Sequence, residues 1–405
     1  MFLGMRWLTR PTWPVGVGVS LLLLTSSALA HGPIPPQPVE WEPGRLLIQL
    51  APAVDPLAAA ASRGDLTSDL AALNARFGVY AARAVLPQYA PVALEALDRS
   101  APGRQLPAGE RALMDRLGRW VLLEVDAKVD VQAMVEAYEA LDEVERAEPD
   151  YLARVVEGVP SSGSAAPLIG TAQGAAPDLT PNDPRLGEQW GLAAIDAPGA
   201  WEITQGSPTK VIAIIDTGVD LDHPDLAAKI WINSDEAPGD SNGDTCPGIC
   251  SLDDDGDGLI DEDGAGTQKG EPGWDAAFAA DDDENGYIDD FRGWDWIGAG
   301  EGFEDNDPQD DNGHGTHCAG IAAAATDNFI GIAGACPLCT VMPLKAFQSS
   351  GSAAYSDIAL AIDYARRNGA KVISMSFGSY ADAALVRDAL GLAYSSSVLV
   401  AAAGN

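Results

Sequence analysis

The stretch Lys210–Gly218, which reads Lys-Val-Ile-Ala-Ile-Ile-Asp-Thr-Gly, decides the fold of this chain. It is a continuous apolar run that ends in a carboxylate and a glycine turn. Such runs are typical of strands buried on both faces of a parallel sheet. Ligands and catalytic groups gather at the carboxyl ends of these strands. Asp216, at the end of the run, is therefore a candidate functional residue.

A second stretch, Asn312–Gly320, reads Asn-Gly-His-Gly-Thr-His-Cys-Ala-Gly and holds two of the four histidines. The small-residue run that follows it suits a tightly buried helix. Histidine gives and takes protons near neutrality. A base at a helix start needs a partner that orients it and a nucleophile that it serves. We therefore expect His314 to be a general base and Asp216 to orient it.

The last third of the chain alternates between strand patterns and helix patterns. This alternation predicts an α/β fold with a doubly wound parallel sheet and right-handed crossovers. Strands are expected over Val341–Phe347, Lys371–Phe377 and Val398–Ala403, and helices over Ser356–Asn368 and Ala381–Ser395.

With the final Ala-Ala-Gly-Asn, these motifs resemble those of the subtilisin-like serine proteases, in the same chain order of Asp and His. The resemblance implies a serine endopeptidase in which Asn405 donates its amide to the oxyanion, alongside the Asp216–His314 pair. It also implies a nucleophilic serine in a Gly-Thr-Ser-Met-Ala segment after that Asn, and the 405 residues contain no such segment. We expect the serine to lie beyond Asn405 and the chain as written to be inactive.

The same resemblance predicts a substrate cleft for protein or peptide segments. Ser376, Phe377 and Gly378 match one edge strand, and Ser350 and Gly351 match the facing one. A peptide between them would pair as an added strand. Plain core packing is the alternative reading of Phe377.

Composition narrows the partners and the compartment. A net charge of −36 argues against nucleic acid and anionic membrane surfaces. Residues 1–30 combine two arginines, a short apolar core and an Ala-x-Ala site, which predicts a secretory signal and an extracellular protein. A membrane anchor is the alternative, but the apolar core is shorter than the ~18 residues that a span needs.

Residues 31–156 predict a small α+β domain. Its place in the chain and its Val-x-x-x-Glu-Pro-Asp ending resemble the inhibitory propeptide of the family, and an unrelated domain is the alternative. Strands are expected over Arg45–Leu50 and Trp120–Val125, helices over Leu66–Phe77 and Val131–Leu141, and an edge-like segment over Val144–Tyr151.

Residues 157–180 are rich in Gly, Ser, Ala and Pro and predict a linker with the processing site. Residues 181–405 form the expected catalytic domain.

The catalytic domain carries an acidic insertion, residues 235–311, with an internal repeat of Asp-x-Asp-x-Asp/Asn-Gly. Oxygen ligands at alternate positions before a Gly are typical of loops that wrap Ca²⁺. A solvated acidic surface is the alternative. The predicted ligands are Asp253, Asp255, Asp257 and Asp261 in the first copy and Asp281, Asp283, Asn285 and Asp289 in the second.

The resemblance implies a further structural Ca²⁺ site, shared by Asp183, Asp225 and the loop that holds Asp327 and Asn328. This loop is one residue longer than in the family.

Five cysteines are present, four of them in two close couples. With a secretory signal they favour local disulfides, Cys246–Cys250 and Cys336–Cys339, over a zinc site of four thiolates. Cys318, on the expected catalytic helix, should be buried and unpaired. We do not expect it to be a nucleophile, because it would point poorly toward a base on the same helix.

Two rival functions remain. A metal hydrolase would use His314 and His317 on one helix face, which leaves Asp216 and Asn405 without a role. A binding protein would keep the fold and the cleft without the nucleophile.

Overall fold

The computed structural model describes residues 39–61, 69–100, 106–156, 180–234, 283, 285–287, 290–298 and 304–404. The predicted signal peptide, the linker, the first copy of the acidic repeat, the Cys246–Cys250 pair and Asn405 lie outside these ranges. The described residues belong to one compact unit, Val39–Asn405. We call residues 39–156 the N-terminal region and residues 180–404 the C-terminal region.

A five-stranded parallel sheet forms the centre of the C-terminal region, with the strand order β11-β9-β5-β7-β6. The predicted α/β fold is confirmed. Its strands are β5 (Val211–Asp216), β6 (Trp294–Asp295), β7 (Thr340–Lys345), β9 (Val372–Met375) and β11 (Val398–Ala401). The helices of the region are α6 (Trp190–Ala194), α7 (Ala197–Ile203), α8 (His314–Ala323), α9 (Tyr355–Arg367) and α10 (Ala384–Ala393).

The second sheet has the order β10-β4-β1-β3-β2, and β8 also pairs with β4. Its strands are β1 (Trp41–Leu50), β2 (Ala81–Ala84), β3 (Trp120–Glu124), β4 (Val144–Val155), β8 (Ser352–Ala354) and β10 (Phe377–Gly378). The N-terminal helices are α1 (Pro56–Ala61), α2 (Asp69–Phe77), α3 (Pro91–Ser100), α4 (Ala108–Leu117) and α5 (Val131–Tyr138). Single 3₁₀ turns lie at Pro87–Tyr89, Leu186–Glu188 and Ala227–Lys229.

The predicted helix after Asp130 is present, and its N-cap works as expected. Oδ1 of Asp130 accepts hydrogen bonds from the backbone N–H groups of Gln132 and Ala133. One side of this helix packs on the inner face of β1 and β3, in a cluster that includes Leu46, Val121 and Met134. The N-terminal region therefore has a core of its own.

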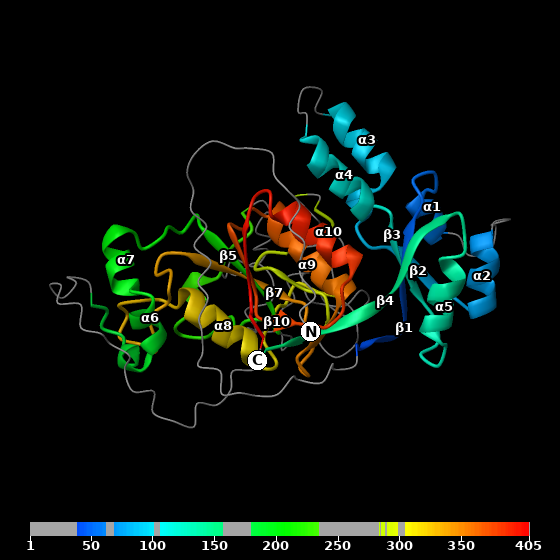
Figure 1. The fold of residues 1–405 in the computed structure, drawn as a ribbon. Helices are drawn as coiled ribbons and strands as arrows, with labels where there is room; N and C mark the ends of the chain where they lie inside the picture. The colour runs from blue at the N-terminus through cyan, green and yellow to red at the C-terminus, as the bar shows by residue number, and fades with distance from the viewer. Residues whose placement is uncertain are drawn as a thin grey trace, which may run out of the picture. The chain divides into compact units, whose positions relative to one another are not determined.

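The segment after Val144 is longer and more embedded than predicted. It is an edge only within the N-terminal region, because β4 pairs with β1 along most of its length and its last residues, from Leu152 on, lie between β8 and β10. Figure 1 shows β4 running from the N-terminal sheet into the C-terminal region. Strand β4 thus joins the N-terminal sheet to the C-terminal region. Helices α3 and α4, between β2 and β3, were not predicted either. None of the described helices combines the length and the apolar character that a bilayer span needs.

Candidate active site

Asp216 ends the central strand β5 and is fully buried. Its Oδ1 accepts a hydrogen bond of 2.8 Å from the backbone N–H of Thr217 and lies 2.7 Å from Nδ1 of His314. A buried carboxylate in this position fixes the tautomer and the direction of an imidazole. The structure therefore brings the predicted pair together across 98 residues of sequence.

His314 is the first residue of α8, and the glycines around it make the close approach to β5 possible. Gly313, at the N-cap, has φ +99°. A Cβ at Gly315 would lie 2.0 Å from the carbonyl oxygen of Gly218, so only glycine fits there. The Gly-His-Gly pattern is thus required by the packing of the helix start against the end of the strand.

The environment of His314 favours its charged form. The hydrogen bond with Asp216 is the main cause that raises the pKa of the imidazole, while partial burial acts in the opposite direction. An imidazolium that forms during proton transfer is thereby stabilised.

Asp310 was missed by the sequence analysis, and it holds the start of α8 in place. Its carboxylate accepts hydrogen bonds from the backbone N–H groups of Asn312, Gly313 and Thr316 and from the hydroxyl of Thr217. Burial alone would raise the pKa of Asp310, but the hydrogen bond from the Thr316 hydroxyl and those from the three backbone N–H groups lower it. The signal was readable, since an Asp just before a helix start is typical of a capping residue.

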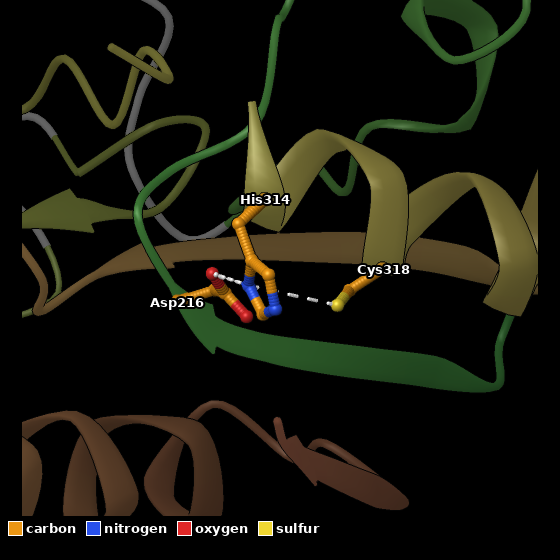
Figure 2. Close-up of side chains that lie close together, drawn as sticks. All are labelled: Asp216, His314 and Cys318. Carbon is orange, nitrogen blue, oxygen red and sulfur yellow. Dashed lines mark hydrogen bonds and ion pairs between the residues drawn. The ribbon is translucent and has the colours of Figure 1, made fainter. Parts of the chain in front are cut away.

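Cys318 lies beside the base, and its Sγ is 3.9 Å from Nδ1 of His314 (Figure 2). It forms no disulfide, as predicted, but it is only partly buried rather than buried. Cys318 thus lies near Nδ1 of the imidazole, the nitrogen that is already hydrogen-bonded to Asp216. Burial raises the pKa of the thiol to about 12, so it stays protonated at neutral pH. A protonated thiol is a poor nucleophile. This supports the prediction that Cys318 is not the nucleophile, although the reason is its protonation and not the direction of its side chain.

The opposite nitrogen of the ring faces a peptide. Nε2 of His314 lies 3.2 Å from the carbonyl oxygen of Val156, the residue that follows β4. The backbone N–H of Val156 donates to the carbonyl oxygen of Ser376 over 2.8 Å, and that of Val155 donates to Gly351 over 2.9 Å. An extended segment therefore lies between two edges and ends at the base.

Four of the five predicted cleft residues take part in this arrangement. Phe377 and Gly378 form β10 and pair with Val155 and Arg154 of β4. The ring of Phe377 also packs against Phe347, with centroids 4.8 Å apart, so this residue combines core packing with backbone pairing to β4. Ser350 differs, because its hydroxyl bonds to Ser352 over 2.8 Å.

Residues 208–405 match the family model described as the subtilase family, a peptidase family. The chain belongs to the subtilase family through these residues. It is 35% identical over 228 residues to thermitase of Thermoactinomyces vulgaris, covering 56% of this chain and 58% of that protein. It is 31% identical over 278 residues to a thermophilic serine proteinase of Bacillus sp. (strain AK1), covering 68% and 48%.

The chain thus spans about half of the length of these relatives, 58% and 48%. Among solved structures, fervidolysin from Fervidobacterium pennivorans, a keratinolytic enzyme related to subtilisin, is 20% identical with a TM-score of 0.45. The match covers 90% of this chain and 40% of that one.

The four residues of the predicted shared Ca²⁺ site of this subtilase lie together. Asp327 donates its backbone N–H to Oδ2 of Asp183 over 2.9 Å, and the amide of Asn328 donates to Oδ1 of Asp225 over 2.8 Å. Oδ1 of Asp183 is buried without a hydrogen-bond partner. An orphaned buried carboxylate oxygen is costly unless a cation or water satisfies it, so the donor set fits a hard cation such as Ca²⁺.

The second copy of the acidic repeat is described in part. Asp283 and Asn285 lie with Asn233 and the buried Asp290, whose carboxylate accepts 2.7 Å and 2.9 Å hydrogen bonds from the two amides. Burial raises the pKa of Asp290. Asp290 and Asn233 were not predicted as members of this cluster. The repeat spacing predicted Asp289 instead of its neighbour Asp290 as a ligand. Asp289 and Asp281 lie outside the described residues.

Two predictions about sulfur and metal chemistry are settled by the described residues. Cys336 and Cys339 form the predicted local disulfide, which excludes a zinc site of four thiolates. His317 is exposed. In the described ranges, the potential metal ligands whose donor atoms lie near that of His314 are Asp216 and Cys318, not His317, so the structure does not support the pairing of His314 with His317 proposed for a metal hydrolase.

Proposed function

We propose that this subtilase is a serine endopeptidase that cuts extended segments of proteins. The observation that carries the proposal is the strand β4, which lies between two edges with the Val156 carbonyl against Nε2 of His314. That is the place where a general base must meet both the nucleophile and the bond to be cut. Backbone pairing is how a cleft accepts many sequences.

In this mechanism Asp216 holds Nδ1–H of His314 and stabilises the imidazolium. His314 takes the proton of a serine hydroxyl and returns it to the leaving amine. Asn405 would donate to the oxyanion that develops on the attacked carbonyl. Among the described residues, Nε2 has the Val156 carbonyl as its partner and no serine hydroxyl. We propose that the nucleophilic serine is not one of these 405 residues.

We further propose that the N-terminal region is an inhibitory propeptide. Its last strand occupies the cleft in the manner of a substrate, so protein substrates are excluded while it is bound. The carbonyl of Val156 lies 3.2 Å from Nε2 of His314, and this contact supports the proposal that processing occurs at the bond that follows Val156. This position is at the start of the segment in which the sequence predicts processing.

Secretion and bound Ca²⁺ complete the proposal. The apolar core and the Ala-x-Ala site near the N-terminus support export. The unpartnered Oδ1 of Asp183 supports a structural Ca²⁺ at the shared site, and Asp183, Asp225, Asp327 and Asn328 would hold it. The Ca²⁺ would neutralise clustered carboxylates and stabilise the loop that follows α8.

The test compares the 405-residue chain with a form that also carries a Gly-Thr-Ser segment after Asn405. Casein hydrolysis and labelling by a fluorophosphonate should appear only in the second form. There, His314→Ala should lower kcat by a factor on the order of 10⁶. His317→Ala, an exposed position on the same helix, should leave kcat unchanged. Stoichiometric, heat-sensitive labelling of the 405-residue chain would disprove the assignment, because a serine already present would then be the nucleophile.

A further inference from the structure

Between β2 and β3 the N-terminal region carries a helical segment, described at residues 86–100 and 106–118, and these residues take no part in either sheet. It contains a 3₁₀ turn at Pro87–Tyr89 and helices α3 and α4. We call it the hairpin. Figure 1 draws it beside α10, and α4 makes close contact with that helix. No residue of the catalytic pair or of the cleft belongs to this contact.

The polar contacts of the hairpin are made by side chains. Nε and an Nη of Arg116 donate to the two carboxylate oxygens of Asp388 on α10, over 2.9 Å and 2.8 Å. On α9, Asp363 accepts hydrogen bonds from Gln88 over 2.8 Å and from the hydroxyl of Tyr89 over 2.6 Å. Paired bonds between a guanidinium and a carboxylate are strong and geometrically specific. Asp363 is buried, so these two donors, together with Arg366 of its own helix at 3.2 Å, replace water that it has lost.

Apolar side chains close the rest of this contact. A Cβ placed on Gly391 of α10 would lie 3.4 Å from Cδ2 of Leu113, so the side chain of Leu113 fills the space that this glycine leaves. Buried residues of the hairpin and of the two helices form one continuous cluster, with Leu86, Leu94, Met114 and Leu117 from the hairpin and Leu385, Ala389 and Leu392 from α10. Removing the hairpin would expose this apolar surface.

We propose that the hairpin is a second docking element of the N-terminal region, independent of the strand in the cleft. It keeps the N-terminal region bound to the α9–α10 surface after the chain has been cut between the two regions. The partner that this surface fits is an amphipathic helix that presents an arginine to Asp388 and hydrogen-bond donors to Asp363. The proposal rests on the proposed function in one respect, which is that the connection is cut during maturation.

The experiment uses the full chain with a foreign protease site placed within residues 160–175. The folded protein is cut with that protease. One piece is immobilised on a sensor surface, and the rate at which the other piece dissociates from it is measured. The wild-type pieces should stay together. Arg116→Glu should speed separation about tenfold, since it exchanges a paired charge for repulsion at a partly exposed site. Asp388→Arg in the same chain should restore most of the loss.

A matched control lies in the hairpin itself. Arg111 pairs with Asp98 on the neighbouring hairpin helix, 3.0 Å away, so Arg111→Glu should leave separation unchanged. Tyr89→Phe keeps the ring and removes the hydroxyl that donates a hydrogen bond to Asp363, so it should also speed separation. It provides a second test if Arg116→Glu folds poorly. Equal rates for wild type, Arg116→Glu and Tyr89→Phe would overturn the proposal. So would immediate separation of the wild-type pieces.

No step of this assay needs peptidase activity, so its outcome is separate from that of the proposed function. A chain that fails to cleave casein can still show hairpin-dependent binding. A working peptidase can equally show a hairpin that contributes nothing.

Discussion

Strand β4 meets the C-terminal region at two places and by different means. At the cleft end, residues 152–156 are held by backbone hydrogen bonds to β8 and β10, and the side chain of Arg154 is exposed. Near the middle of the strand, the carboxylates of Glu148 and Asp150 are buried against the first turns of α10 and α9. The first contact is made by backbone hydrogen bonds and therefore tolerates sequence change. The second reads side chains and is specific for this N-terminal region.

The physical basis of the second contact is the unsatisfied N–H groups at a helix start. Asp150 accepts 2.9 Å and 2.8 Å hydrogen bonds from the backbone N–H and the hydroxyl of Ser356. Glu148 accepts 3.1 Å hydrogen bonds from the backbone N–H of Ala384. Neither helix has a capping hydrogen bond from its own N-cap residue. The N-terminal region therefore supplies the caps of two helices in the C-terminal region.

The largest effect should follow from breaking the buried cap at α9. Asp150→Ala removes the buried acceptor of the Ser356 N–H and hydroxyl and one of the two buried carboxylates beside Arg45. In the cut-chain assay we expect the dissociation constant to rise roughly a hundredfold. Asp150→Asn keeps one oxygen acceptor and should cost less than half as much free energy. Equal constants for wild type and Asp150→Ala would show that the cap contributes nothing to binding.

Calcium removal should be the next largest effect, and it acts on one partner alone. Neither end of β4 contains a residue of the shared site, so a chelator should destabilise the C-terminal region while the N-terminal core keeps its hydrogen-exchange protection. A cation at a hundred times its Kd stabilises the folded state by about 2.7 kcal/mol. We expect the melting temperature to fall by several degrees, and Asp183→Ala to abolish this response. A melting temperature that ignores free Ca²⁺ over a thousandfold range would rule out the site.

A smaller effect should come from pH, through Asp357 in the first turn of α9. Burial first, and the neighbouring Asp150 second, raise the pKa of this carboxyl to about 7 against the opposing effects of Arg45 and Arg83. The bound state therefore favours the protonated form. The stabilisation of the bound state by protonated Asp357 is complete below pH 4. It is lost as the pH rises through 7, and the affinity does not change further above that pH.

We expect the cut chain to separate roughly tenfold faster at pH 8 than at pH 5, the equivalent of one pKa unit. Asp357→Asn should flatten the profile, because an amide does not titrate. A profile that stays as steep in Asp357→Asn would assign the dependence to another group, such as Glu148, whose pKa is also raised by burial.

The sequence predicted what depends on local pattern and missed what depends on distant partners. Asp216 and His314 were predictable because each sits in a contiguous motif at the end of a strand or the start of a helix. The role of Asp150 was not, because its partner Ser356 is 206 residues away and nothing in Glu-Pro-Asp marks a cap for another helix. The hairpin was missed because its short helices gain their stability from packing on α9 and α10 rather than from propensity.

The smallest effect should come from the side chain of Arg154, and it is the sharpest test of the comparison. Arg154 pairs with Glu40 at 2.6 Å, but both side chains are about half exposed, at 57% and 48%. Exposed pairs contribute at most about 1 kcal/mol and often nothing. Arg154→Ala should therefore change the rate of separation by less than about threefold.

The matched variant on the same strand is Val155→Pro. It removes the N–H that donates to Gly351 and leaves that carbonyl without its partner. If the cleft reads the backbone, this variant must speed separation far more than Arg154→Ala, although both change one residue at the cleft end of β4. If instead Arg154→Ala matches Val155→Pro, the cleft recognises the arginine itself. Its preference for substrates would then include a basic residue two positions before the one that meets His314.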